Sequence, residues 1–253
     1  MAYFNYYSKK IYYKIYGQGV PLIMLHGDNA SSKMFQYLIS LYDCNFKVIL
    51  LDFLGNGKSQ RIEHFPENHW IYQADQVIKL IEYLNLEKVN IIGCSGGAWT
   101  AINVALKRPD LINKIITDSF DGRTLHKNFA KELVAERNKA KADKSAREFY
   151  KWCQGEDWEK VIDANTRALV NCAQSKRPLF IKDLALLKTP ILFVGSHEDQ
   201  MCRKDMYEEY RQMFKIVAKG KIYMFEKGGH PTILSNAEKF SVLVKDFILD
   251  LNK

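Results

Sequence analysis

The run Val89–Ala98 constrains the fold of this 253-residue chain more than any other stretch. It starts as a short apolar segment, passes through Gly93-Cys94-Ser95-Gly96-Gly97, and continues with small and apolar residues at helical spacing until Pro109. This pattern predicts a buried strand, a tight turn and a helix that ends before the proline. Because a serine in so tight a turn has a strained backbone, its flanking positions must be nearly free of side chains.

A serine held between a strand and a helix, with glycines two residues before and after it, matches a nucleophile elbow. Its hydroxyl would stand over the strand end, where the helix N-terminal amides can stabilise an oxyanion. The motif alone also describes a glycine-rich turn with an idle serine. A histidine, an acid and a second oxyanion donor in the right order are therefore needed to support the assignment.

The rest of the chain alternates apolar strand segments with helical segments. This alternation predicts an α/β fold with a mainly parallel sheet and helices on both faces. The predicted strands lie within residues 3–16 and at 21–25, 46–51, 89–92, 114–118, 190–194 and 221–225. The clearest amphipathic helices are predicted at 70–84 and 237–251.

Residues 120–188 break this rhythm, because they contain no convincing strand and are rich in helix-forming Lys, Arg, Glu and Ala. We therefore predict a core made of residues 1–119 and 189–253, with a helical lid at 120–188 inserted between two strands. Ligand sites in such sheets lie at the C-terminal strand ends, where the insertion begins and ends. We expect Trp152 and Trp158 to help close a largely apolar pocket; the alternative is a helical excursion that packs elsewhere.

Composition excludes several functional classes. The net charge is +8, but the lysines are spread along the chain and no nucleic-acid motif accompanies them, so no nucleic-acid partner is predicted. No apolar run is long enough to span a membrane, and the N-terminus lacks a signal-peptide pattern. Five cysteines without close pairs indicate reduced thiols, which favours the cytoplasm. The sequence sets no oligomeric state.

One loop imitates a nucleotide-binding motif. Gly57-Lys58-Ser59 resembles the end of a phosphate-binding loop, but that motif requires a glycine where this chain has Asp52. A carboxylate there would repel polyphosphate, so we expect a tight structural loop. Neither a cofactor nor a metal ion is predicted, since no cluster of His, Cys or Asp has metal-ligand spacing.

The chain supplies an oxyanion donor and a base. His26-Gly27 follows a strand expected beside the elbow strand, so the Asp28 amide can join the Gly96 amide in an oxyanion hole. His26 itself is expected to be structural, with its ring beneath the loop. His230, in Gly228-Gly229-His230-Pro231 after the last strand, is the candidate general base. We expect the remaining histidines to be surface or polar-loop residues, namely His64, His69, His126 and His197.

An acid must orient His230, and three carboxylates end strands near the site. Asp199 and Glu198 share the loop after the strand at 190–194, and Asp118 ends the strand before the insertion. We predict Asp199, because Ser95, Asp199 and His230 then follow the chain order of a known triad. Glu198 and Asp118 remain as alternatives.

With these motifs in this order, nearly the whole chain resembles the α/β-hydrolase superfamily, in its lidded single-domain branch. The resemblance implies a nucleophile at Ser95, a base at His230 and oxyanion amides at Asp28 and Gly96. Two departures stand out: the family's usual acid spacing would select Glu198, and the Asp28 carboxylate could weaken the oxyanion hole or select a cationic or hydroxylated substrate.

The resulting prediction is a serine hydrolase that cleaves a small or medium carboxylic ester through an acyl-enzyme at Ser95. The alternatives are hydrolysis of an amide, a thioester or a carbon–carbon bond on the same fold, or a non-catalytic binding protein.

Overall fold

A single eight-stranded sheet organises residues 2–250, which are the residues that the structure, a computed structural model, describes. The strand order is β1-β2-β4-β3-β5-β6-β7-β8. β1 pairs antiparallel with β2 and β2 with β4, while the other pairs are parallel, so the predicted mainly parallel α/β sheet is confirmed. The strands are β1 (Ala2–Tyr6), β2 (Lys9–Tyr16), β3 (Val20–Leu25), β4 (Phe46–Leu51), β5 (Val89–Cys94), β6 (Ile112–Asp118), β7 (Ile191–Ser196) and β8 (Gly220–Phe225).

Helices follow most of the strands. The α-helices are α1 (His69–Tyr83), α2 (Gly96–Lys107), α3 (Phe129–Ala142), α4 (Lys144–Gln154), α5 (Trp158–Ser175), α6 (Met206–Ile216), α7 (Thr232–Ser235) and α8 (Ala237–Leu249), and the 3-10 helices are η1 (Ser32–Leu41), η2 (Pro109–Leu111) and η3 (Leu184–Leu186). Among residues 2–250, no helix is both long and apolar enough to cross a membrane.

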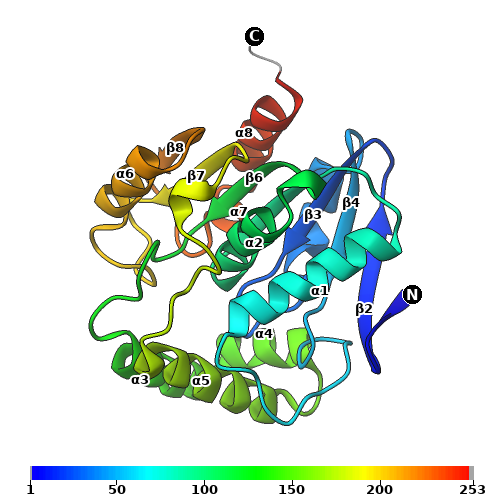
Figure 1. Cartoon of the computed structure of the whole chain (residues 1–253). Helices are drawn as coiled ribbons and strands as arrows, with labels where there is room; N and C mark the ends of the chain where they lie inside the picture. Colours follow the sequence, from blue (N-terminus) through cyan, green and yellow to red (C-terminus); the bar gives the residue numbers. More distant parts are fainter. Residues whose placement is uncertain (1, 251–253) are drawn as a thin grey trace.

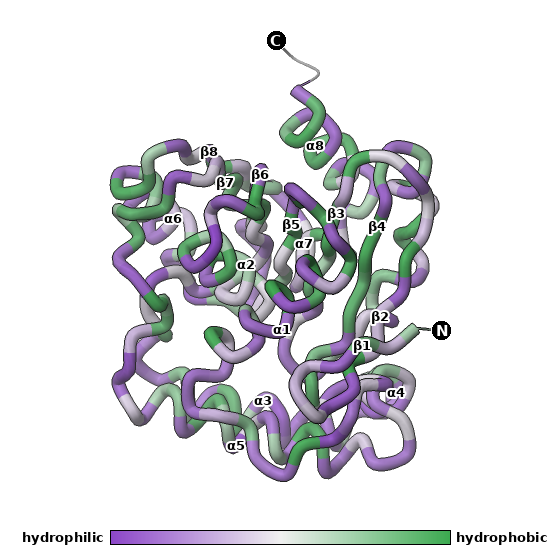
Figure 2. Tube along the Cα trace, turned by 45° about the vertical axis from the view of Figure 1, so that its right-hand side comes forward, coloured by the Kyte–Doolittle hydropathy of each residue, from purple (hydrophilic) through white to green (hydrophobic). Residues whose placement is uncertain are grey.

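The side chains of the central strand β5 contribute to two hydrophobic layers, one on each face of the sheet. Since successive side chains of a strand point to opposite faces, Ile91 joins the layer that contains α1, α2 and α6, whereas Ile92 joins the layer of η1 and α8. Figure 1 shows α1 and α2 on one face of the sheet, and the strands carry much of the apolar colour in Figure 2. Because every residue of β5 is buried, the turn that follows it starts from a rigid platform.

The segment between β6 and β7 is helical, as expected. Its helices α3, α4 and α5 pack on one another and lie together at one end of the sheet (Figure 1). α4 also contacts η1, where Lys33 Nζ donates to the Trp152 carbonyl and Ser31 Oγ donates to the Cys153 carbonyl at 3.0 Å. These contacts anchor the segment to the sheet side of the molecule.

The loop after β4 is structural, as the sequence predicts. The two carboxylate oxygens of Asp52 accept hydrogen bonds from the backbone amides of Ser32 and Lys58, each at 2.7 Å. Gly57 has φ +54°, and a Cβ atom built on it would lie 2.1 Å from Asp52 Oδ2. The carboxylate thus fills the space that a phosphate would need.

Candidate active site

The turn after β5 holds Ser95 in a strained conformation, with φ +52° and ψ −121°. Its amide donates to the Asp118 carbonyl at 2.8 Å, and its carbonyl accepts from the Ala98 amide at 2.9 Å. A Cβ atom on Gly93 would lie 2.1 Å from the Gly97 carbonyl oxygen, and one on Gly97 would lie 2.6 Å from the carbonyl oxygen of β3 residue Leu25. The glycine spacing is therefore a steric requirement of a turn that presents Ser95 at the N-terminus of α2.

Cys94 faces the other way. It is fully buried in the layer of η1 and α8, whereas Ser95 lines a cavity at the sheet edge. Burial, with a smaller contribution from Asp118, raises the pKa of the Cys94 thiol well above its usual range. Cys94 is therefore an inert thiol that cannot substitute for the serine hydroxyl.

The loop after β3 passes close to the serine. A Cβ atom built on Gly27 would lie 3.0 Å from Ser95 Cβ, so a side chain there would press on the serine, and glycine permits this close approach. The Asp28 side chain packs on the start of α2, because a Cβ atom on Gly96 would lie 2.3 Å from Asp28 Oδ2. This loop thus lies beside Ser95 and places the Asp28 carboxylate against Gly96.

Two histidines surround this loop, and both are buried. His26 Nδ1 donates to the Gly27 carbonyl at 2.8 Å, and its Nε2 accepts from the Phe53 amide at 3.1 Å, which confirms its structural role. Burial lowers the pKa of His26 and keeps its ring neutral. His69 is only 1% exposed and its Nε2 lies 3.3 Å from Asp28 Oδ1, so its interpretation as a surface or polar-loop residue is wrong.

His230 lies in the loop after β8 and meets a carboxylate from the loop after β7. Its Nδ1 lies 2.9 Å from Asp199 Oδ2, and Asp199 Oδ1 accepts from the Met201 amide at 2.9 Å. Burial alone would raise the pKa of Asp199, but the hydrogen bond and charge of His230 outweigh it and lower this pKa. With Nδ1 facing Asp199, Nε2 is the ring nitrogen left for the cavity that His230 shares with Ser95.

The two alternative acids have other partners. Glu198 Oε2 accepts from the Gly228 amide at 3.4 Å. Asp118 is fully buried and accepts hydrogen bonds from Ser119 Oγ, Thr232 Oγ1 and the Ile233 amide. Burial raises the pKa of Asp118 to about 6. Of the three predicted carboxylates, Asp199 is therefore the one that is hydrogen-bonded to His230.

A cavity of about 160 Å³ contains the serine and the histidine. Its apolar wall comes from Trp99 of α2 and from the helical segment, including Phe129, Leu133 and Leu169. Its polar wall includes Asp28, Asp121, His126, Glu132, Glu136 and Arg137. The cavity is therefore lined mainly by apolar surface, as expected, and charged side chains of α3 and the preceding loop add a polar wall.

Comparison with known proteins gives the family. The family model described as the alpha/beta hydrolase fold matches residues 20–153, which is more than half of the chain. The chain belongs to the α/β-hydrolase family. Its match to "AB hydrolase superfamily protein YisY" of Bacillus subtilis (strain 168) is 26% identical and covers 91% of this chain and 92% of that protein.

Other relatives of this hydrolase carry more specific names. The 2-hydroxy-6-oxo-6-phenylhexa-2,4-dienoate hydrolase of Comamonas testosteroni is 31% identical over 42% of this chain and 38% of that protein. The solved structure of an esterase from Exiguobacterium antarcticum superposes with a TM-score of 0.74 at 23% identity, covering 95% of this chain and 96% of that one. These matches confirm the fold.

The structure corrects two expectations about the hydrolase's helical segment. Trp152 stacks on Tyr37 at 6.0 Å between ring centroids, and Trp158 stacks on Tyr150 at the same distance. Neither tryptophan is among the residues that line the cavity of Ser95. Both rings pack between helices, Trp152 of α4 against η1 and Trp158 of α5 against α4.

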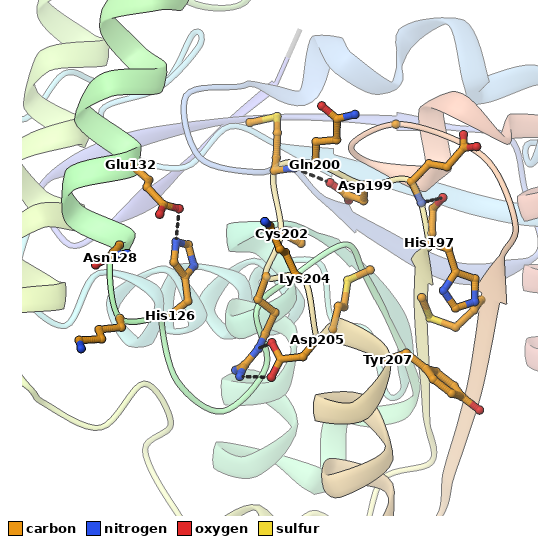
Figure 3. Close-up of a pocket in the computed structure, with 18 residues that line it drawn as sticks. His126, Asn128, Glu132, His197, Asp199, Gln200, Cys202, Lys204, Asp205 and Tyr207 are labelled. Atoms are coloured by element: carbon orange, nitrogen blue, oxygen red, sulfur yellow. Dashed lines mark hydrogen bonds and ion pairs between the residues drawn. The ribbon is translucent and has the colours of Figure 1, made fainter.

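Sequence reasoning also missed His126 and Arg137. His126 was expected to be a surface or polar-loop residue; it lies in the loop before α3 and lines the cavity, with its Nδ1 2.6 Å from Asp121 Oδ2 and its Nε2 2.9 Å from Glu132 Oε2, the latter contact drawn in Figure 3. Arg137 of α3 is 9% exposed. With the Asn29 amide oriented to accept, Arg137 Nε lies 2.6 Å from its oxygen. No local spacing in the sequence indicates that either residue lines the cavity, since the contacts of both depend on how α3 packs.

Proposed function

We propose that this α/β hydrolase is a serine hydrolase that cleaves carboxylic esters through an acyl-enzyme at Ser95. The observation that carries the proposal is the hydrogen bond of His230 Nδ1 to Asp199, in a loop that shares one cavity with the strained Ser95. This is the arrangement in which an acid sets the tautomer of a histidine that serves as general base. The esterase among the structural relatives supports the same class.

In the proposed mechanism, His230 Nε2 takes the proton of Ser95 as the hydroxyl oxygen attacks the ester carbonyl. Asp199 stabilises the imidazolium that forms, and the amides of Asp28 and Gly96 stabilise the tetrahedral oxyanion. The alkoxide leaves with the proton from His230. Water then attacks the acyl-enzyme by the same sequence of proton transfers and frees the serine.

The cavity suggests which esters fit. Four carboxylates and one guanidinium line it, namely Asp28, Asp121, Glu132, Glu136 and Arg137. Two of these charges form an ion pair, since Arg137 Nη1 lies 2.7 Å from Glu136 Oε2. We propose that this negative surplus favours small esters with a cationic or neutral group over anionic ones. Choline and 3,3-dimethylbutyl esters of one acid compare matched shapes, and Asp28→Asn should reduce the preference for choline.

We also propose that residues 120–188 act as the lid, over a core of 1–119 and 189–253. The lid supplies the apolar cavity wall through Phe129, Leu133 and Leu169, and Arg137 connects it to the loop of the proposed oxyanion donor Asp28. Leu133→Ala should therefore change the preference among esters of graded acyl length more than it changes cleavage of an acetyl ester. The cysteines are free thiols, which supports a cytoplasmic location.

Ser95→Ala tests the proposal directly. We expect a loss of about 10⁴-fold or more in turnover of a p-nitrophenyl ester, with the thermal unfolding midpoint nearly unchanged. A fluorophosphonate probe should label the wild-type protein and not the variant. Wild-type turnover in Ser95→Ala would show that the nucleophile is misassigned, and an ester panel that includes an amide and a thioester defines the bond that is cleaved.

A further inference from the structure

Three potential metal ligands lie close together where the loops after β7 and β8 meet. Asp199, Cys202 and His230 each offer one ligand atom, and these atoms all lie within 4.8 Å of one another. They form the one such group of three His, Cys, Asp or Glu side chains found among residues 2–250. The sequence predicts no metal site because 28 residues separate Cys202 from His230, and only the fold brings the loops after β7 and β8 together.

The distances match those of a tetrahedral ion. Zn²⁺ ligand bonds of about 2.3 Å to sulfur and about 2.1 Å to nitrogen or oxygen place neighbouring ligand atoms roughly 3.4–3.6 Å apart. Cys202 Sγ lies 3.7 Å from His230 Nδ1, and Asp199 Oδ2 lies 2.9 Å from the same nitrogen. The Cys202–His230 separation already fits, the His230–Asp199 separation would have to widen by about 0.5 Å, and the ligand atoms of Asp199 and Cys202 lie within 4.8 Å of each other.

The charges and the access also suit a soft divalent cation. A thiolate and a carboxylate neutralise its two positive charges, and the imidazole adds a neutral ligand. Cys202 lines both the Ser95 cavity and the adjoining surface groove, where Figure 3 shows it near Asp199 on the loop after β7. An ion can thus enter from solvent, and water can complete its coordination.

We propose that Asp199, Cys202 and His230 form an inhibitory binding site for Zn²⁺ and Cd²⁺. Binding releases the Cys202 thiol proton to solvent and forms a metal–sulfur bond. The ion also replaces the hydrogen on His230 Nδ1, and the ring takes a hydrogen at Nε2, so the ring remains neutral. In this tautomer Nε2 has no lone pair for the Ser95 proton. The inhibition, unlike the metal binding, rests on the proposed function of His230.

Cys202 lies beside His230 on the loop after β7, and its thiol must lose its proton to bind an ion. Coordination removes the proton because the ion stabilises the thiolate. The chain also offers matched controls: Cys172 is buried in α5, and Cys44 is exposed far along the chain from the site.

The first experiment measures metal binding itself. Titration of the chelator-treated protein with Cd²⁺ should produce a thiolate-to-metal charge-transfer band that saturates at one ion per chain. Cys202→Ser should remove the band or weaken the affinity by about 10- to 100-fold, and Cys172→Ala and Cys44→Ser should preserve it. Cys202→Ala serves if the serine variant folds poorly. A band that persists without Cys202, or its absence in the wild-type protein, overturns the site.

The second experiment measures inhibition. Saturating Zn²⁺ should slow fluorophosphonate labelling of the wild-type protein about tenfold or more, and EDTA should restore it. The labelling of Cys202→Ser should respond to Zn²⁺ only at concentrations higher by about 10- to 100-fold. Unchanged labelling at saturating Zn²⁺ overturns the inhibition. If the metal-free protein is not labelled at all, the proposed function fails, and the Cd²⁺ band still decides the metal site.

Discussion

Two carboxylates that follow neighbouring strands of the sheet have opposite environments. Asp118 ends β6, is fully buried, and has its oxygens occupied by Ser119, Thr232 and the Ile233 amide. Asp199 follows β7 and accepts a hydrogen bond from His230 at the cavity wall. Burial raises the pKa of Asp118 to about 6, whereas the histidine lowers that of Asp199 despite its burial.

The comparison shows that hydrogen-bond partners, rather than strand position, separate a structural acid from a candidate catalytic one. Two of the donors to Asp118, Thr232 Oγ1 and the Ile233 amide, tie the end of β6 to the start of α7, which begins two residues after His230. Asp118 therefore holds the histidine loop in place, and Asp199 orients the ring itself. Variants of the two residues should separate stability from turnover.

The largest effect is expected from Asp199→Asn. The amide can present its nitrogen to His230 Nδ1, which favours the tautomer with a hydrogen on Nε2 and removes the base. Turnover of an ester should fall about 10³- to 10⁴-fold, with little change in KM or in the unfolding midpoint. Steady-state kinetics and thermal unfolding of the same preparation measure both quantities. Near wild-type turnover would return the acid role to Glu198 or Asp118.

Asp118→Ala should act mainly on stability. It leaves the Thr232 hydroxyl and the Ile233 amide without their buried acceptor and creates a small cavity. The free energy of unfolding should fall by about 2–4 kcal/mol in urea denaturation. Turnover by the folded fraction should fall far less than in Asp199→Asn. If the two variants lose turnover equally while Asp118→Ala stays stable, the distinction between these acids collapses.

The raised pKa of Asp118 predicts a pH dependence of stability. Its pKa is 3.8 in the unfolded chain and about 6 in the folded protein, so between these values the folded state binds more protons. The stabilisation that Asp118 contributes through this pKa difference is fully present below about pH 4. It is lost as the pH rises through 6, and the loss in unfolding free energy is roughly 3 kcal/mol at most. Asp118→Asn, whose amide can donate to the Ser119 and Thr232 hydroxyls, is the matched control. As the pH rises over this interval, the free energy of unfolding of the wild type should fall relative to that of Asp118→Asn. A constant difference between the two proteins would contradict the prediction.

Glu198→Gln should be nearly silent. Its carboxylate accepts one long hydrogen bond from the Gly228 amide, and glutamine retains an acceptor there. Turnover should stay within about twofold of wild type, and stability within about 0.5 kcal/mol. Kinetics side by side with Asp199→Asn provide the check. A loss of several orders of magnitude in Glu198→Gln would mean that the loop presents Glu198 to His230 during catalysis.

Most of the sheet could be predicted from local pattern. The strands at 46–51 and 221–225 and the helices near 70–84 and 237–251 agree with β4, β8, α1 and α8 to within a few residues. Their apolar residues recur at the period of the element they form, so short windows of sequence contain the signal. The charged cavity wall could not be predicted, because His126 and Arg137 reach it only through the packing of α3.

The sequence by itself determined the elbow and the family, because the contact that requires a glycine at Gly93, with the Gly97 carbonyl oxygen, lies within the motif itself. Only the tertiary structure decided which of Asp118, Glu198 and Asp199 meets His230, and that Cys202 joins them. Neighbouring carboxylates have nearly the same chemistry in sequence. Asp199 and His230 lie 31 residues apart, in two different loops. Which carboxylate meets the histidine therefore depends on how the whole sheet packs.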